Sequence, residues 1–169
     1  MQRRAAAACT AGAAAGPREA VCLPAGVSRD AWVAAWVLGC YADLSQLEPK
    51  LADACSPAGC PEMAVGELSC PWPGDGRPVP AREYLRLTLA LAREALGDPA
   101  LAAPEFHASW RFCDRLRGRM QMLLQSLLCV YAHALLRHGS QLESTGARER
   151  LTSSLRRFLA LAHEFRLLQ

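Results

Sequence analysis

Two cysteines and two histidines, placed as two close pairs far apart in the chain, most constrain how this sequence can fold. Four residues separate Cys55 from Cys60, four separate His133 from His138, and 72 lie between Cys60 and His133. Two thiolates and two imidazoles complete the tetrahedral ligand set of a structural Zn²⁺, with no position left open for substrate or water. The pattern predicts one zinc ion that ties two distant segments into one domain.

The spacing of the histidines sets a geometric condition on that site. On a regular helix, positions five apart point about 140° away from each other. We therefore expect the helix to unwind at Gly139, directly after His138, so that His138 can turn back toward His133. The alternative is that His133 is a hydrogen-bonded core histidine and that His138 lies at the negative end of the helix dipole. The matching cysteine pair favours the metal.

The bulk properties of the chain exclude several classes of protein. With 169 residues the chain can form one domain with a hydrophobic core, and a net charge of +3 is too small to indicate a nucleic-acid partner. No segment approaches the roughly 20 consecutive apolar residues of a transmembrane helix. The H-E-x-x-H, phosphate-loop and G-x-S-x-G motifs are absent from the sequence. We expect a protein that is not an enzyme and binds neither nucleic acid nor membrane.

The N-terminal segment, residues 1–19, is rich in alanine and predicts a disordered tail. A cleaved targeting signal is the alternative, because Arg3 and Arg4 precede the alanines, but a signal peptide has a core richer in Leu, Ile or Phe. The eight cysteines leave a second alternative open, a secreted helical protein with paired disulfides. We otherwise expect most of the other cysteines to be small core residues in a reducing compartment.

Hydrophobic periodicity predicts an all-α fold, a small helical bundle with a metal-tied loop over residues 55–80 that is either irregular or a weak hairpin. Capping and breaking residues set the expected helix limits. The expected helices begin at Ser28, Pro80, Ala108 and Arg148 and end near Pro49, Leu96, His138 and Leu167.

Several short motifs occur in the order found in a known family. They are A-V-C-L-P from Ala20, A-C-S-P-A-G-C-P-E-M from Ala54, V-Y-A-H from Val130 and E-F-R-L-L from Glu164. On these residues the chain resembles the MOB (Mps-one-binder) family of kinase activators. The resemblance implies that residues 20–169 form a MOB-like helical bundle with one Cys2His2 zinc. It also implies a non-enzymatic adaptor that binds and helps activate NDR or LATS kinases, or binds their scaffolds, in the cytoplasm and also in the nucleus.

The chain departs from the family where acidic residues of the first helix meet a basic kinase segment. It has Val27, Ala31 and Gly39 at these positions, with Asp30 as the main acid nearby. It also has Gln125, Ser126 and Cys129 where the family's phosphopeptide pocket has Lys and Arg. A degenerate MOB domain that binds partners without activating a kinase is therefore an alternative.

Other residues are candidates for a partner surface. Arg111, Arg115 and Arg119 are spaced to lie on one helix face, which indicates an anionic partner, although an ordinary solvated face has the same pattern. Trp36 and Asp30 in the first helix are further candidates, with Trp36 as a core residue in the alternative interpretation. The sequence carries no indication of an oligomeric state.

Overall fold

The computed structural model describes residues 21–98, 101 and 111–168. In these residues the chain forms four helices and one small antiparallel hairpin, which pairs Ala64 with Ser69 and Val65 with Leu68. The elements are α1 (Arg29–Ala54), β1 (Ala64–Val65), β2 (Leu68–Ser69), α2 (Ala81–Leu96), α3 (Asp114–Glu143) and α4 (Ala147–Phe165). The expected all-α class is confirmed, and the loop between α1 and α2 takes the hairpin alternative.

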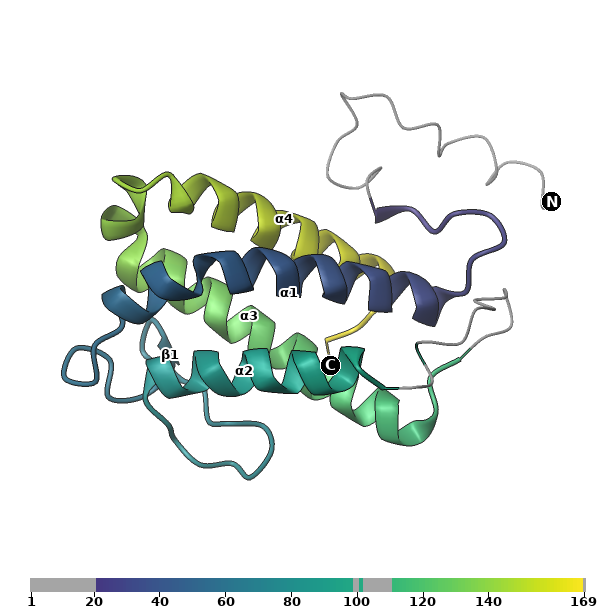
Figure 1. Ribbon diagram of the computed structural model, residues 1–169, viewed down its shortest axis with the longest axis horizontal. Coiled ribbons are helices and arrows are strands. Elements are labelled where there is room, and N and C mark those ends of the chain that lie inside the picture. The colour runs from purple at the N-terminus through teal and green to yellow at the C-terminus, as the bar shows by residue number, and fades with distance from the viewer. Residues whose placement is uncertain (1–20, 99–100, 102–110, 169) are drawn as a thin grey trace.

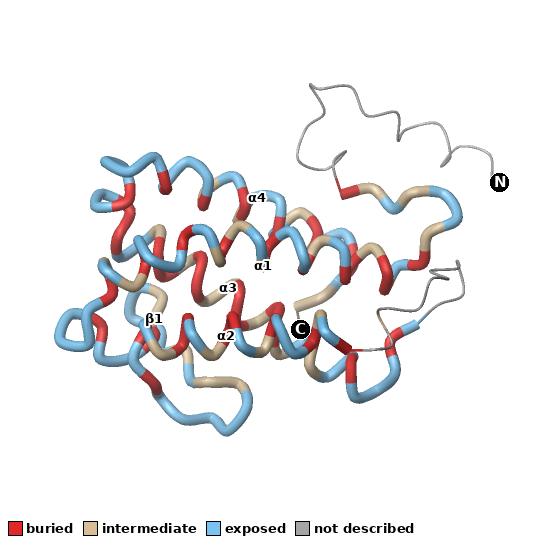
Figure 2. Tube along the Cα trace, in the orientation of Figure 1, coloured by how far each residue is buried: buried red, intermediate tan, exposed pale blue. Residues whose placement is uncertain are grey.

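Helix α3 lies at the centre of the bundle and packs against α1, α2, α4 and β1 (Figure 1). Its buried residues recur at three- and four-residue steps, and Figure 2 shows them as red segments along the helix. Tyr131 of α3 packs on Phe158 of α4 with ring centroids 6.2 Å apart, and both side chains are almost fully buried. The core therefore forms around the helix that carries both histidines.

Helix α1 begins as expected but does not end at Pro49. Its first turn is capped by Ser28, whose Oγ accepts a hydrogen bond from the Ala31 N–H at 3.0 Å. The expected break at Pro49 is wrong, because the helix continues to Ala54. A proline inside a helix costs about 3 kcal/mol, but Leu47 and Leu51 on either side of it are buried and keep this turn on the core. The extension carries the chain to Cys55 in helical geometry.

Helix α2 starts after Pro80 and ends before Gly97, as the sequence predicts. Helix α3 differs at both ends. Residues 111–113 are not helical and α3 starts at Asp114, while the expected start at Ala108 lies outside the described residues. Gly139 does not stop the helix, which continues to Glu143 because Leu142 extends the buried stripe.

The turn into α4 depends on another glycine. Gly146 has a φ of 66°, in the left-handed region that glycine adopts without steric cost. Helix α4 then runs from Ala147 to Phe165, within two residues of its expected limits. None of the helices in the described ranges is both long and apolar enough to cross a bilayer. The predicted tail, residues 1–19, lies outside those ranges.

Candidate metal centre

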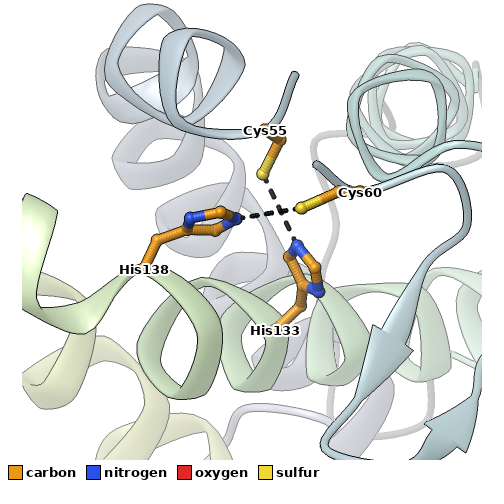
Figure 3. Close-up of side chains that lie close together, drawn as sticks. All are labelled: Cys55, Cys60, His133 and His138. Atoms are coloured by element: carbon orange, nitrogen blue, oxygen red, sulfur yellow. Dashed lines mark hydrogen bonds between the residues drawn. The ribbon is translucent and has the colours of Figure 1, made fainter. Parts of the chain in front are cut away.

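The structure brings together the four residues that the sequence singles out as metal ligands (Figure 3). Their donor atoms all lie within 4.8 Å of one another, and all four residues are buried. The Cys55 Sγ lies 3.5 Å from the His133 Nε2, and the Cys60 Sγ lies 3.3 Å from the His138 Nε2. This is a compact set of two sulfur and two nitrogen donors that could hold one metal ion.

Backbone hydrogen bonds at two helix ends position the cysteines. Cys55 is the C-terminal cap of α1, and its N–H donates to the Leu51 carbonyl at 2.9 Å. Cys60 closes the following turn by donating its N–H to the Ser56 carbonyl at 2.8 Å. The Cys60 carbonyl in turn accepts from the N–H of Ala81, the first residue of α2, at 3.1 Å. The two thiols are thus fixed between the end of α1 and the start of α2.

The histidines converge without any unwinding of α3, so the expected break at Gly139 is wrong here too. Both lie within the helix, and their ring centroids are 5.2 Å apart at an interplanar angle of 66°. The helix separates them by about 7.5 Å along its axis. Both rings present Nε2, the far nitrogen, and the length of the imidazole side chains lets them lean toward one point beside the helix.

Each imidazole is also held at its other nitrogen. The His133 Nδ1 lies 2.7 Å from the Ala64 carbonyl in β1, and the His138 Nδ1 lies 3.1 Å from the Gln141 Oε1. A histidine that binds a metal through Nε2 carries its proton on Nδ1, so both Nδ1–H groups donate to these oxygens. Such partners orient the rings and make Nε2 a better donor. The hairpin therefore serves the site by delivering the Ala64 carbonyl.

Sequence reasoning missed both outer partners. Gln141 stands three residues after His138, at a helical spacing that brings side chains together, so the signal for it was present. Ala64 contributes only its backbone carbonyl, and since every residue type has one, the sequence could not predict this role.

Burial sets the protonation of the free ligands. It raises the pKa of the Cys55 thiol to about 12, with the neighbouring Cys60 adding to the shift. Burial also lowers the pKa of His133, against the opposing hydrogen bond to Ala64. The metal-free site thus favours a neutral Cys55 thiol and a neutral His133 imidazole. A bound cation reverses this preference at the cysteines, because a coordinated thiol loses its proton.

The outer hydrogen bond at His138 leads to a first prediction. Gln141→Ala should weaken metal affinity by about 10- to 100-fold, the usual effect of losing such a partner. Competition with a chromophoric chelator measures this. Gln121→Ala is the matched control, because Gln121 is an exposed glutamine of the same helix that is remote from the four ligands in sequence. Equal affinity of the two variants would show that Gln141 does not support the site.

Of the two candidate partner residues of α1, Asp30 is buried and Trp36 is half-buried. Asp30 is buried, with 8% of its surface exposed, and its Oδ2 accepts a hydrogen bond from the Phe112 N–H at 2.8 Å. This bond joins the start of α1 to the segment before α3. Trp36 is half-buried against the core and meets Trp32 edge to face, with ring centroids 6.2 Å apart.

The three arginines do not form one helical face. Arg111 precedes α3, so the predicted helical placement of Arg111 is wrong. Arg115 pairs at 2.8 Å with Asp98, a buried residue just after α2. Arg119 pairs at 2.7 Å with Glu94 of α2. The two arginines within α3 therefore link this helix to α2 and to the residues that directly follow α2.

The positions of α1 where the family has acidic residues are not all exposed. Ala31 is buried, with 6% of its surface exposed, so it is no surface position for an acid. The outward positions of α1 include Ala35, Leu38, Gly39 and Ala42. This exposed stretch carries no charge.

Comparisons with known proteins identify the family of this chain. The model of the Mob1/phocein family matches residues 11–169. The DBF2 kinase activator protein MOB1 of Saccharomyces cerevisiae is 28% identical over 158 residues, 89% of this chain and 49% of that protein. The maintenance of ploidy protein mob1 of Schizosaccharomyces pombe is 27% identical over 156 residues, 89% of this chain and 73% of that protein.

A plant relative shows the same extent of similarity. The MOB kinase activator-like 1A of Arabidopsis thaliana is 27% identical over 158 residues, 89% of this chain and 72% of that protein. The chain thus spans about half of the budding-yeast relative and nearly three quarters of the other two. With a family match over nearly its whole length, a helical bundle and a buried Cys2His2 cluster, this chain belongs to the Mob1/phocein family.

Proposed function

We propose that this chain is a non-enzymatic adaptor, stabilised by one zinc ion, that binds a protein kinase of the NDR/LATS type or its scaffold and regulates it. The observation that carries the proposal is the family match over residues 11–169. Relatives similar over 89% of the chain are named as a kinase activator in a yeast and as kinase activator-like in a plant. The proposal includes a location in the cytoplasm and also in the nucleus.

The donor set supports zinc as the metal. Two thiolates and two imidazoles in a tetrahedral arrangement suit Zn²⁺, whereas Mg²⁺ and Ca²⁺ prefer oxygen ligands. The protein supplies all four donors, and a catalytic zinc keeps one position open for water. Cys55 caps the end of α1 and Cys60 lies in the loop before α2, while His133 and His138 lie on α3. A zinc ion here would hold the loop and hairpin against the central helix.

A second candidate role is binding without activation, and the surface of α1 favours it. The exposed residues Ala35, Gly39 and Ala42 offer no acid to a basic kinase segment. Ser126, at one position of the family's phosphate pocket, is buried, and its hydroxyl donates to the Met122 carbonyl of its own helix at 2.9 Å. Complementary charge raises the association rate and the specificity of such contacts. A competitor would occupy a partner but not increase kinase activity.

Calorimetry against a basic regulatory segment of an NDR-type kinase tests the contact. We expect weak or undetectable binding by the unmodified chain and about a three- to tenfold gain from the double variant Ala35→Glu/Gly39→Glu, which adds two surface charge pairs. A side chain fits at Gly39, since no neighbouring atom lies within 4 Å of the position that its Cβ would take.

The matched control is Gln121→Glu/Ser140→Glu, which adds the same charge at exposed positions of α3. Tight binding by the unmodified chain would contradict the expected loss and support a conventional activator. Equal binding by the two double variants would show that α1 is not the contact surface. A kinase assay with the bound chain then separates activation from competition.

A further inference from the structure

A pocket of about 350 Å³ lies against one side of the metal centre, between the loop after α1 and helix α3. The residues that line it include Cys60 and His133 but neither Cys55 nor His138. Ala64 of β1 also lines it, and the hairpin strands in Figure 3 lie on the side of His133 and Cys60. The pocket therefore leads from the surface to two of the four candidate ligands.

Two walls of different kinds form this pocket. One is the loop and hairpin over residues 59–66, and the other is the surface of α3 around Leu136 and Arg137. The loop wall is anchored at Cys60, whose N–H and carbonyl are both in backbone hydrogen bonds. Leu136 lines the pocket although 69% of its surface is exposed, which places it at the mouth. The size of this one side chain can therefore change the width of the opening.

An opening matters here because the candidate ligands are otherwise closed off from solvent. Cys60 and His133 each have only about 4% of their surface exposed. A metal ion can reach such a site either through an opening in the folded chain or after the surrounding segments unfold locally. An entry path is one of the features that a metal site in a folded protein should have. The pocket supplies such an opening on the side of Cys60 and His133.

The charges that line the pocket do not favour one sign. They are the carboxylate of Glu62 on the loop and the guanidinium of Arg137 on α3, and both side chains belong to exposed residues. A strongly positive opening would repel a divalent cation, and a strongly negative one would repel an anionic chelator. With one charge of each sign, the opening admits both.

We propose that this pocket is the path by which the metal ion enters and leaves the folded protein, and that Cys60 and His133 are the ligands that an incoming chelator reaches first. The proposal rests on the zinc site of the proposed function and adds its route of exchange. Pockets for small molecules span about 300–1,000 Å³, so this one fits compact chelators. Exchange is a substitution without redox change: a chelator atom bonds to Zn²⁺ as the bond to Cys60 or His133 breaks, and a released thiolate takes up a proton.

The first measurement is the rate at which the zinc-loaded full chain gives up its metal to a small chromophoric chelator. We expect the rate to rise with chelator concentration without a plateau, because the chelator attacks the folded protein. Release that first requires local unfolding would instead reach a limiting rate. The same chelating group attached to a large dextran should remove the metal several-fold more slowly, since the polymer cannot enter the pocket.

Variants at the mouth give the sharper test. Leu136→Trp should slow both the release and the uptake of Zn²⁺ several-fold, and Leu136→Ala should speed both. A path changes the two rates by the same factor, so the zinc affinity should stay as in the wild type. Leu159→Trp and Leu159→Ala are the matched controls and should leave both rates unchanged, because Leu159 is an exposed leucine of α4 that does not line the pocket.

The possible results separate the path from the zinc site itself. A chain that binds zinc, but releases it at a rate that neither chelator concentration nor a change at Leu136 alters, would overturn the path and leave the zinc site standing. An altered affinity in the Leu136 variants, with only one of the two rates changed, would show that this residue acts on the site and not on access, which also overturns the path. A chain that binds no zinc would overturn both proposals together.

Discussion

Removing the metal from the purified chain should lower its thermal midpoint more than any single surface substitution. The four candidate ligands are buried and join the turn after α1 to the C-terminal half of α3, so the metal-free loop loses the tie that closes it. Structural zinc supplies about 10 kcal/mol or more of apparent binding free energy in small zinc peptides. The effect here should be smaller, since the four helices bury a core of their own.

Metal analysis and melting curves check this prediction. We expect one zinc ion per chain after reducing purification, and a lower midpoint after chelation that added Zn²⁺ restores. Because the thiols must lose their protons to bind the ion, acidification should release the metal and remove its share of the stability. Well under one zinc ion per chain, or a thermal midpoint that the chelator does not change, would contradict a structural metal.

Replacing one ligand should have nearly the same effect as removing the ion. Cys60→Ser and His133→Ala each leave three donors, and His133→Ala also removes the hydrogen bond to the Ala64 carbonyl. A buried site that loses its metal keeps polar groups without their partner, which adds a desolvation cost. Both variants should therefore melt far below the wild type and contain little zinc.

The matched control is Cys113→Ser, because Cys113 is exposed and lies outside the cluster. Surface substitutions of this kind usually change stability by about 0.5 kcal/mol or less. The ligand variants should also respond little to a chelator, since the chelator removes an interaction that they have already lost. Similar melting shifts in all three variants, or a full chelator response in Cys60→Ser, would argue against a structural site.

The cluster that could hold a metal could be predicted without a structure because metal chemistry depends on residue type and on number. Cys55, Cys60, His133 and His138 are two sulfur and two nitrogen donors in two close pairs, and few other roles require that set. The limits of α2 were equally accessible, since Pro80 and Gly97 act on their own backbone. These features depend on the chemistry of the residues themselves, which can be read directly from the sequence.

The C-terminal ends of α1 and α3 could not be predicted from local residue preferences. Pro49 and Gly139 weaken a helix by intrinsic preference, yet α1 and α3 continue through both. Buried Leu51 and Leu142 beyond them gain more from packing than the breakers cost. Packing against neighbouring helices can outweigh a local helix-breaking preference of a few kcal/mol, and only the folded chain specifies those neighbours.

The pairing of side chains from different elements also required the tertiary structure. Arg115 and Arg119 looked like an open basic face, but Asp98 and Glu94 come from α2 and its end to pair with them. His133 likewise meets the Ala64 carbonyl only because the hairpin packs on α3. Residue types and spacing therefore determined which atoms this chain has for binding a metal. The packing of α2 and the hairpin on α3 decided which charges are paired and which carbonyl holds the His133 ring, because those contacts join residues that are distant in the sequence.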